Sequence, residues 1–179
     1  MAMKEHQRKI RRVVRASPAE VDALSAFIQY HADLGEILPR SVEEIHATLH
    51  DWWLVRDEVG MLACGSLWEY GPHLAEVRSL LVHPRAQGQG WGRAVLDALK
   101  VEAARRGIDA LLSVTTTVEF FARCGFVPVA LSAFPDKVRK DCVGCPLYGS
   151  CTKAALVFDL ATVLEQAGPV ESQLVVMAP

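Results

Sequence analysis

A glycine-rich run is the part of this sequence whose residue types and spacing predict chemistry most clearly. Residues 87–92 read Gln-Gly-Gln-Gly-Trp-Gly, between an apolar stretch that ends at Val82 and an amphipathic stretch that continues to Arg106. Glycine lets backbone approach a ligand without a Cβ in the way and tolerates a positive φ. The free N–H groups at the start of a helix bind anions. The run therefore predicts a site for a phosphate or pyrophosphate group.

Two other nucleotide-binding turns fit this run poorly. A dinucleotide-binding turn needs G-x-G-x-x-G after the first strand of a β-α-β unit, whereas this chain has G-x-G-x-G after several expected antiparallel strands. A Walker loop ends in Gly-Lys-Ser or Gly-Lys-Thr, and the chain reads Gly92-Arg93-Ala94. A tight turn without a ligand stays open, although clustered glycines are entropically costly for that purpose alone.

Two motifs resemble those of the GNAT acetyltransferases. Gln87-x-x-Gly90-x-Gly92 is similar to the family's first cofactor motif, and residues 120–126 (Phe-Phe-Ala-Arg-Cys-Gly-Phe) are similar to its second. The resemblance covers residues 10–160 and implies an α/β (α+β) GNAT fold, with a mixed, mostly antiparallel sheet that splays at the cofactor site and is flanked by helices. It also implies an acetyl-CoA-dependent N-acetyltransferase. The residues it implies for binding acetyl-CoA are Leu80, Leu81, Val82, Gln87, Gly88, Gln89, Gly90, Trp91, Gly92, Arg93 and Phe121.

Acetyl transfer to an amine requires a neutral amine and a stabilised oxyanion. By the resemblance, a backbone N–H near Leu81 donates to the oxyanion. Glu76 precedes it on the same expected strand and is the candidate general base, acting through water; the alternatives are a solvated carboxylate or one paired with Arg78. Many family members reprotonate the leaving thiolate with a tyrosine. Phe121 stands at that position, which leaves water or Cys124 as the proton donor.

A narrower resemblance concerns the acceptor. Residues 37–41, 74–79 and 139–141 are similar to the acetyltransferase domain of N-acetylglutamate synthases and to short amino-acid acetyltransferases. Glutamate carries two carboxylates, which the planar guanidinium group of arginine binds well. The expected acceptor is the α-amine of L-glutamate or a related amino acid, which implies arginine biosynthesis; a peptide, a polyamine or a non-catalytic acyl-CoA sensor stays open. The candidate acceptor-binding residues are Arg40, Arg78, Thr116, Arg139 and Lys140.

Three cysteines follow these basic residues, at Cys142, Cys145 and Cys151. A C-x-x-C pair often begins a zinc site, but zinc normally takes four protein ligands in a structural site. Cys64, Cys124 or a histidine would have to complete the set. Zinc, a redox pair and free thiols all stay open.

Capping signals and apolar periodicity predict the elements that position these residues. Ser17-Pro18 with Glu20 predicts one helix start, and Ser41 with Glu44 predicts another. The expected order β-α-α-β-β-β-α-β-α-β-β is an antiparallel series that leads into a crossover helix. The strands are expected over 10–16, 52–55, 61–70, 76–82, 110–115, 126–131 and 154–160, and the helices over 18–34, 41–50, 90–106 and 118–124.

Composition limits the class of protein. The chain has 179 residues, 51% hydrophobic and 22% charged, with a net charge of −2, which predicts one packed domain without general affinity for nucleic acid or membrane. No apolar run reaches the roughly 20 residues of a membrane helix, and the N-terminus lacks a signal sequence, so a cytoplasmic protein is expected. The expected organisation is an arm over 1–9, an acetyltransferase domain over 10–165 and a tail over 166–179. The expected partner is a small-molecule amine, and a homodimer is left open.

Overall fold

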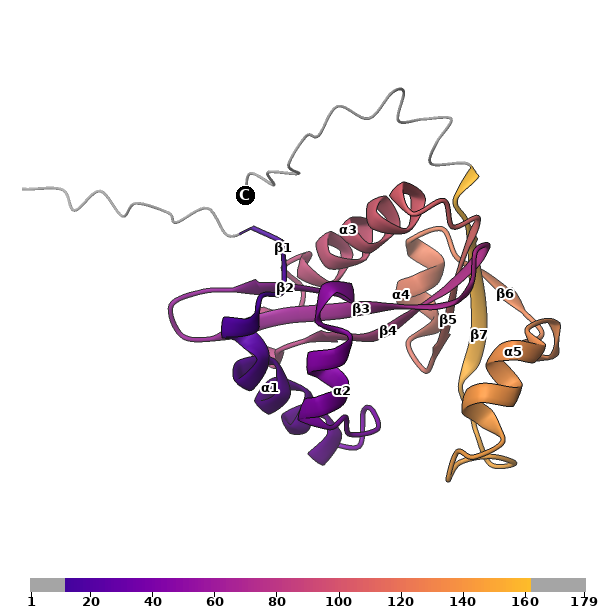
Figure 1. Cartoon of the computed structure of the whole chain (residues 1–179), viewed down its shortest axis with the longest axis horizontal. Helices are drawn as coiled ribbons and strands as arrows, with labels where there is room; N and C mark the ends of the chain where they lie inside the picture. The colour runs from indigo at the N-terminus through magenta and orange to yellow at the C-terminus, as the bar shows by residue number, and fades with distance from the viewer. Residues whose placement is uncertain (1–11, 162–179) are drawn as a thin grey trace, which may run out of the picture.

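A seven-stranded sheet with helices on both faces forms the centre of the molecule, as the computed structural model shows (Figure 1). The structure describes residues 12–161; the expected arm over 1–9 and tail over 166–179 lie outside them. The strand order is β1-β2-β3-β4-β5-β7-β6, in which β4 and β5 are parallel and all other neighbours antiparallel. The expected mixed, mostly antiparallel sheet is confirmed.

The elements follow the expected order, and a short helical segment is added near the end. The strands are β1 (Val14–Arg15), β2 (Trp52–Arg56), β3 (Met61–Gly71), β4 (Leu74–Val82), β5 (Ala110–Thr115), β6 (Val127–Val129) and β7 (Ala154–Asp159). The helices are α1 (Val21–Asp33), α2 (Val42–Ala47), α3 (Trp91–Arg105), α4 (Val118–Arg123) and α5 (Pro135–Lys137), and α5 continues into the π-helical turn η5 (Val138–Cys142). None of the helices within residues 12–161 has the length and apolar character needed to cross a bilayer.

Both expected capping signals are present at the first two helices. The Ser17 N–H and hydroxyl donate to Glu20 Oε2 at 2.7 and 2.6 Å, and the turn they close leads into α1. The Glu44 N–H donates to Ser41 Oγ at 3.1 Å at the start of α2. The first N–H groups of a helix have no carbonyl acceptor within the helix. The Ser41 hydroxyl supplies such an acceptor, and the Glu20 carboxylate fixes Ser17 at the start of the first turn.

Two hydrophobic clusters pack against opposite faces of the sheet. Helices α1 and α2 cover one face, and α3 and α4 cover the other (Figure 1). The first cluster includes Leu24, Ile45 and Leu54, and the second includes Leu99 and Phe121, all buried. Each such side chain contributes about 1.5–3 kcal/mol through removal from water, so the two clusters hold the helices against the sheet.

Strand β4 carries a bulge that decides which side chains face which cluster. Cys64 of β3 pairs with Leu81, but Ser66 pairs with Arg78, and Ser79 between them has a φ of +47°. The extra residue shifts the alternation of β4 by one. As a result, Arg78 before the bulge and Leu81 after it both lie on the α1–α2 face.

The pairing of β4 with β5 is short. It starts at the first residue of each strand, joins Leu74–Glu76 to Ala110–Leu112, and does not extend to the C-terminal ends of the strands. The two parallel strands therefore separate where β4 approaches the glycine-rich loop, which is the splay expected at the cofactor site.

Candidate active site

The N-terminus of α3 has the properties of an anion site. Gly88 and Gly90 have φ values of +73° and +83°, in the left-handed region that favours glycine. A Cβ built at either position meets no atom within 4 Å, so the space beside this backbone is open. The first turn of α3 closes when the Ala94 N–H donates to the Gly90 carbonyl at 3.0 Å. Among the described residues, no acceptor takes a hydrogen bond from the N–H groups of residues 88–93.

Contacts within the chain hold this loop in place. The Arg85 guanidinium donates to both carboxylate oxygens of Asp57 at 2.8 and 2.9 Å, and the Arg85 hydrogen bonds hold the pKa of Asp57 well below its usual range. The side-chain amide of Gln89 donates to the Arg85 carbonyl at 2.9 Å, and that of Gln87 to the Val82 carbonyl at 3.4 Å. A Cβ at Gly92 would lie 3.1 Å from the Val82 side chain, so this glycine allows close packing of helix on strand.

The loop therefore fits the diphosphate of a nucleotide cofactor. Within residues 12–161 the N–H groups of residues 88–93 have no hydrogen-bond acceptor, the helix dipole adds partial positive charge, and the space beside Gly88 and Gly90 is open. Other expected cofactor residues lie on β4 and in the first turn of α3. Leu80 packs on the α3 side, Leu81 is buried on the α1–α2 side, Trp91 begins α3, and Arg93 is exposed and lies 3.9 Å from Asp97.

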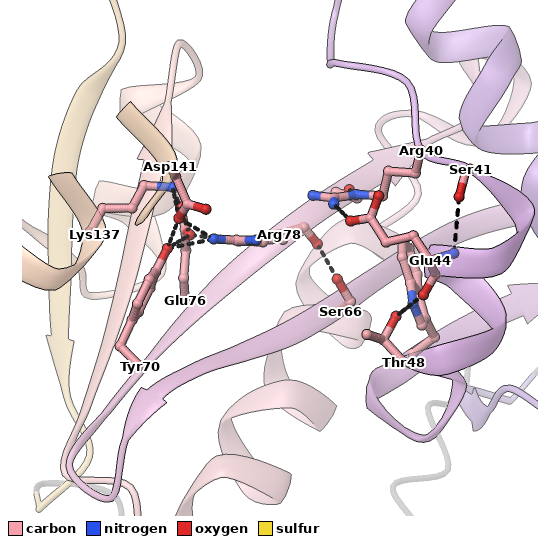
Figure 2. A network of polar contacts seen from close by, with 12 residues as sticks. Arg40, Ser41, Glu44, Thr48, Ser66, Tyr70, Glu76, Arg78, Lys137 and Asp141 are labelled. Atoms are coloured by element: carbon pink, nitrogen blue, oxygen red, sulfur yellow. Dashed lines mark hydrogen bonds and ion pairs between the residues drawn. The ribbon is translucent and has the colours of Figure 1, made fainter. Parts of the chain in front are cut away.

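A group of charged and polar side chains lies on the same face of the sheet as α1 and α2, next to α5 and η5. It consists of Tyr70, Glu76, Arg78, Lys137 and Asp141, here named the acceptor-side cluster (Figure 2). Glu76 Oε2 accepts hydrogen bonds from Tyr70 Oη at 2.7 Å, from Arg78 Nε at 2.7 Å and from Lys137 Nζ at 2.9 Å. Asp141 Oδ2 contacts Tyr70 and Arg78 and accepts from Lys137 Nζ at 3.2 Å.

The cluster balances its charges internally. Burial would raise the pKa of Asp141, but the hydrogen bond from Tyr70 and the charges of Arg78 and Lys137 lower it. Burial would lower the pKa of Arg78, but the adjacent Glu76 outweighs it and the pKa rises. Burial, reinforced by the Glu76 charge, raises the pKa of Tyr70. The cluster thus pairs two basic side chains, Arg78 and Lys137, with two carboxyl groups, Glu76 and Asp141.

Strand and helix geometry explains why these side chains meet. Trp68 pairs with Glu76, and paired residues of antiparallel strands share a face. The Arg78 guanidinium lies over the Trp68 ring at 4.5 Å from its centroid, which fixes its direction. Lys137 and Asp141 are four residues apart on the added helical segment and form an ion pair along one side of it.

Arg40 lies on the side of Arg78 that faces away from Tyr70 and Lys137, as Figure 2 shows. Its Nε donates to Ser79 Oγ at 3.0 Å, and its Nη1 pairs with Glu44. The positive φ of Ser79 therefore coincides with a contact to a partly buried arginine. Arg40 and Arg78, both expected from the sequence, lie on one face of the sheet and bracket the bulge of β4.

Of the other expected acceptor-binding residues, Arg139 and Thr116 lie apart from the cluster, and Lys140 lies near its edge. Arg139 is exposed and pairs with Asp136, and Thr116 is exposed between β5 and α4. Lys140 is exposed, with its Nζ 5.7 Å from the centroid of the Tyr70 ring. Their roles stay predictions.

Phe121 and Cys124 both belong to the core on the α3 side. The Phe121 ring is buried and packs edge-on against Phe120 and Phe126, with centroids 5.2 and 5.1 Å apart. Burial raises the pKa of the Cys124 thiol, and the Cys124 carbonyl accepts from Lys100 Nζ at 2.7 Å. These surroundings are those of packed side chains, and which group protonates the leaving thiolate stays open.

The cysteines that follow the cluster do not form a metal site in this structure. Within residues 12–161, no group of three or more His, Cys, Asp or Glu side chains is placed to hold a metal ion. The zinc alternative for Cys142, Cys145 and Cys151 therefore receives no support. All three are free thiols here.

Comparisons with known proteins agree with this geometry. Residues 48–128 match the acetyltransferase (GNAT) domain model. An amino-acid acetyltransferase of Mycobacterium tuberculosis is 30% identical over 152 residues, which cover 79% of this chain and 86% of that protein. The chain belongs to the GNAT acetyltransferase family. It is an acetyl-CoA-dependent N-acetyltransferase.

Further relatives differ in length from this acetyltransferase. An N-acetyltransferase of Chlorobaculum tepidum is 29% identical over 145 residues, 81% of this chain and 94% of that one. An amino-acid acetyltransferase of Pasteurella multocida is 28% identical over 138 residues, but the match spans only 31% of its length. The N-acetylglutamate synthase of Neisseria gonorrhoeae, solved with coenzyme A and N-acetyl-glutamate, shares the fold with a TM-score of 0.76 at 23% identity, over 85% of this chain and 35% of that one.

Three members of the acceptor-side cluster were not expected from the sequence of the acetyltransferase. Tyr70, Lys137 and Asp141 come from β3 and from the added helical segment. The i, i+4 spacing of Lys137 and Asp141 is the one sequence signal that could have indicated a shared face. Nothing local to Tyr70 indicates that it contacts a residue 71 positions later.

Proposed function

We propose that this acetyltransferase acetylates the α-amine of L-glutamate or a closely related acidic amino acid, as a step of arginine biosynthesis. The observation that carries the proposal is the arrangement of Arg40, Arg78 and Lys137 on one face of β4, beside the bulge at Ser79. Guanidinium and ammonium groups at fixed positions suit an acceptor with two carboxylates. The amino-acid acetyltransferases among the relatives support the same class of acceptor.

Binding such an acceptor involves an exchange of carboxylates. The acceptor-side cluster is already neutral, so an added carboxylate on Arg78 would leave an excess negative charge at a partly buried site. Asp141 is the residue that can leave, because its side chain is 27% exposed and Glu76 only 5%. We infer that the acceptor carboxylate takes the place of Asp141 on Arg78 and Lys137.

Each part of the chain then has a role in the transfer. Bound acetyl-CoA supplies an activated acetyl thioester. The N–H groups of residues 88–93 bind its diphosphate, and a backbone N–H near Leu81 donates to the acetyl oxygen as negative charge develops. Glu76 accepts the amine proton through water, using Oε1, because its three hydrogen bonds among the described residues all go to Oε2.

The role of Glu76 has a direct test in Glu76→Gln. The amide keeps the shape but cannot accept a proton, so kcat should fall about tenfold or more near neutral pH, within the range for general bases. The loss should shrink at high pH, where the free amine is already neutral. If the substitution instead raises the acceptor KM and leaves kcat unchanged at all pH values, Glu76 only anchors Arg78 and Lys137.

A polyamine acceptor is less well supported by the same surface. Polyamines need unpaired carboxylates, and Glu44, Glu76 and Asp141 are each paired with an arginine or lysine of the chain. An assay of coenzyme A release with glutamate, aspartate, glutamine, spermidine and a short peptide separates these classes. Turnover with glutamate far above the others supports the proposal. Turnover with spermidine or the peptide alone would reject it.

A further inference from the structure

The five cysteines of the chain fall into two groups with different surroundings. Cys64 and Cys124 are buried, and burial raises the pKa of both thiols. Buried thiols of this kind are unreactive. Cys142 and Cys145 are only partly buried, and Cys151 is exposed. The second group is therefore open to small oxidants in solution.

Cys142 and Cys145 occupy the two ends of a tight turn. The Cys145 N–H donates to the Cys142 carbonyl at 3.0 Å. The ends of such a turn lie within about 7 Å, which overlaps the roughly 4.4–6.8 Å range of Cα separations in disulfides. Burial raises the pKa of Cys142; Lys137 opposes this, while Asp141, Cys145 and Cys151 raise it further.

The turn is joined directly to the acceptor-side cluster. Cys142 is the last residue of η5 and follows Asp141, whose carboxylate contacts Arg78 and Lys137. The Val143 N–H donates to a carbonyl five residues earlier at 3.1 Å, which ends the π-helical turn there. Asp141 lies on this end of η5, so a movement of the segment would carry its carboxylate away from Arg78 and Lys137. A covalent bond across the turn would restrict that movement.

We propose that Cys142 and Cys145 form a reversible disulfide that holds Asp141 against Arg78 and weakens acceptor binding. The effect on binding rests on the proposed function, whereas formation of the disulfide does not. One cysteine thiolate attacks a sulfur of a low-molecular-weight disulfide, and a thiol leaves. The other thiolate then attacks the mixed disulfide and releases a second thiol. Two electrons pass to the small disulfide, and the two cysteine protons end on the released thiols.

The first measurement is the bond itself. The full chain is treated with oxidised glutathione, free thiols are alkylated, and peptides are analysed by mass spectrometry with metal content measured on the untreated protein. The peptide with Cys142 and Cys145 should escape alkylation and lose two hydrogens in the wild type and in the matched control Cys151→Ser. Cys145→Ser should lack this product. A bond to Cys151 instead, no bond, or one zinc per chain held by these thiols would overturn the proposal.

The second measurement is the kinetic effect. Oxidation should raise the KM for glutamate roughly threefold or more, with the KM for acetyl-CoA unchanged, and a dithiol should reverse the change. Cys145→Ser should be active and indifferent to the oxidant. A disulfide between Cys142 and Cys145 that leaves both KM values unchanged would overturn the proposed effect. If the reduced enzyme does not acetylate glutamate, the proposed acceptor is wrong, while the mass measurement still decides whether the disulfide forms.

Discussion

The polar groups at the N-terminus of α3 and those of the acceptor-side cluster differ in whether they already have partners. Around residues 88–93 the backbone N–H groups have no acceptors among the described residues, and the space beside Gly88 and Gly90 is open. In the acceptor-side cluster both cations are already bound to Glu76 and Asp141. An anion can therefore bind at the helix without competition, whereas an acceptor carboxylate has to replace one that the chain supplies.

The difference indicates how the two halves of the site respond to mutation. At the loop, a substitution acts by obstruction and backbone strain, and the effect should appear in acetyl-CoA binding. In the cluster, the acceptor carboxylate competes with Asp141 for Arg78 and Lys137. A substitution that removes a cation should therefore raise the acceptor KM, and one that removes the competing carboxylate should lower it. The expected effects on ligand binding decrease from the loop to the cluster and vanish away from the site.

Gly90→Val should have the largest effect, because it places a branched side chain where the diphosphate is expected to bind. It also forces a β-branched residue to a φ of +83°, at a cost of about 1–3 kcal/mol. The Kd for acetyl-CoA, measured by calorimetry, should rise roughly 100-fold. Gly107→Val is the matched control, since Gly107 has a φ of +75° with open space around it at the other end of α3. An equal loss of affinity in both variants would mean that instability, not the loop, causes it.

Arg78→Ala should come next. Removing a hydrogen bond between charged groups costs about 1.5–3 kcal/mol, so the acceptor KM should rise roughly 10- to 100-fold while the KM for acetyl-CoA changes little. Arg139→Ala is the comparison, because Arg139 was also expected from the sequence but is exposed and paired with Asp136. If Arg139→Ala is the more damaging of the two, the acceptor lies on the outer side of η5 and not over β4.

Asp141→Asn should act in the opposite direction and more weakly. The amide keeps the shape but competes less for Arg78 and Lys137, so the acceptor KM should fall about three- to fivefold, corresponding to somewhat less than 1 kcal/mol. Steady-state kinetics with glutamate varied at saturating acetyl-CoA measure this. A higher KM in Asp141→Asn would show that Asp141 orients the cations and does not compete with the acceptor.

Glu102→Gln should leave both KM values unchanged and affect only stability. Burial opposes ionisation of Glu102, but hydrogen bonds from Arg105, Arg15 and Arg106 lower its pKa to about 2 from an ordinary value of 4.5. Because the folded pKa is the lower one, this stabilisation is complete above about pH 4.5 and is lost as the pH falls toward 2. Urea denaturation should give a loss of about 2 kcal/mol at pH 7 and roughly half of that or less at pH 3. A loss that is equal at both pH values would contradict the role of the Glu102 charge.

The loop could be predicted from the sequence because its information is local. Three glycines in five residues, followed by an apolar helical period, identify the start of α3 without knowledge of the fold. The capping signals at Ser17 and Ser41 are local for the same reason. Helical structure follows both, although the first turn, Pro18–Glu20, is a 3-10 turn and α1 itself begins at Val21. Strand alternation gave the sheet, although not the bulge at Ser79, because a serine there carries no signal for a positive φ.

The acceptor-side cluster could not be predicted, because it joins segments that are distant in sequence. Arg78 and Glu76 were named, but their partners Lys137 and Asp141 lie on a segment too short for its apolar period to be read. Arg139 was favoured by resemblance. Its position two residues after Lys137 turns it to the opposite side of the helical segment, where it pairs with Asp136.

The most direct test of the account is the preference for glutamate over glutamine, measured as the ratio of kcat/KM in the wild type and in Arg78→Ala. The two acceptors have nearly the same shape and differ only in the side-chain carboxylate of glutamate. The ratio therefore measures whether Arg78 on β4 binds that carboxylate in preference to an amide. We expect glutamate to be favoured by about 100-fold or more in the wild type, and most of that preference to disappear in Arg78→Ala. Equal use of glutamate and glutamine by the wild type, or an unchanged ratio in the variant, would contradict the account.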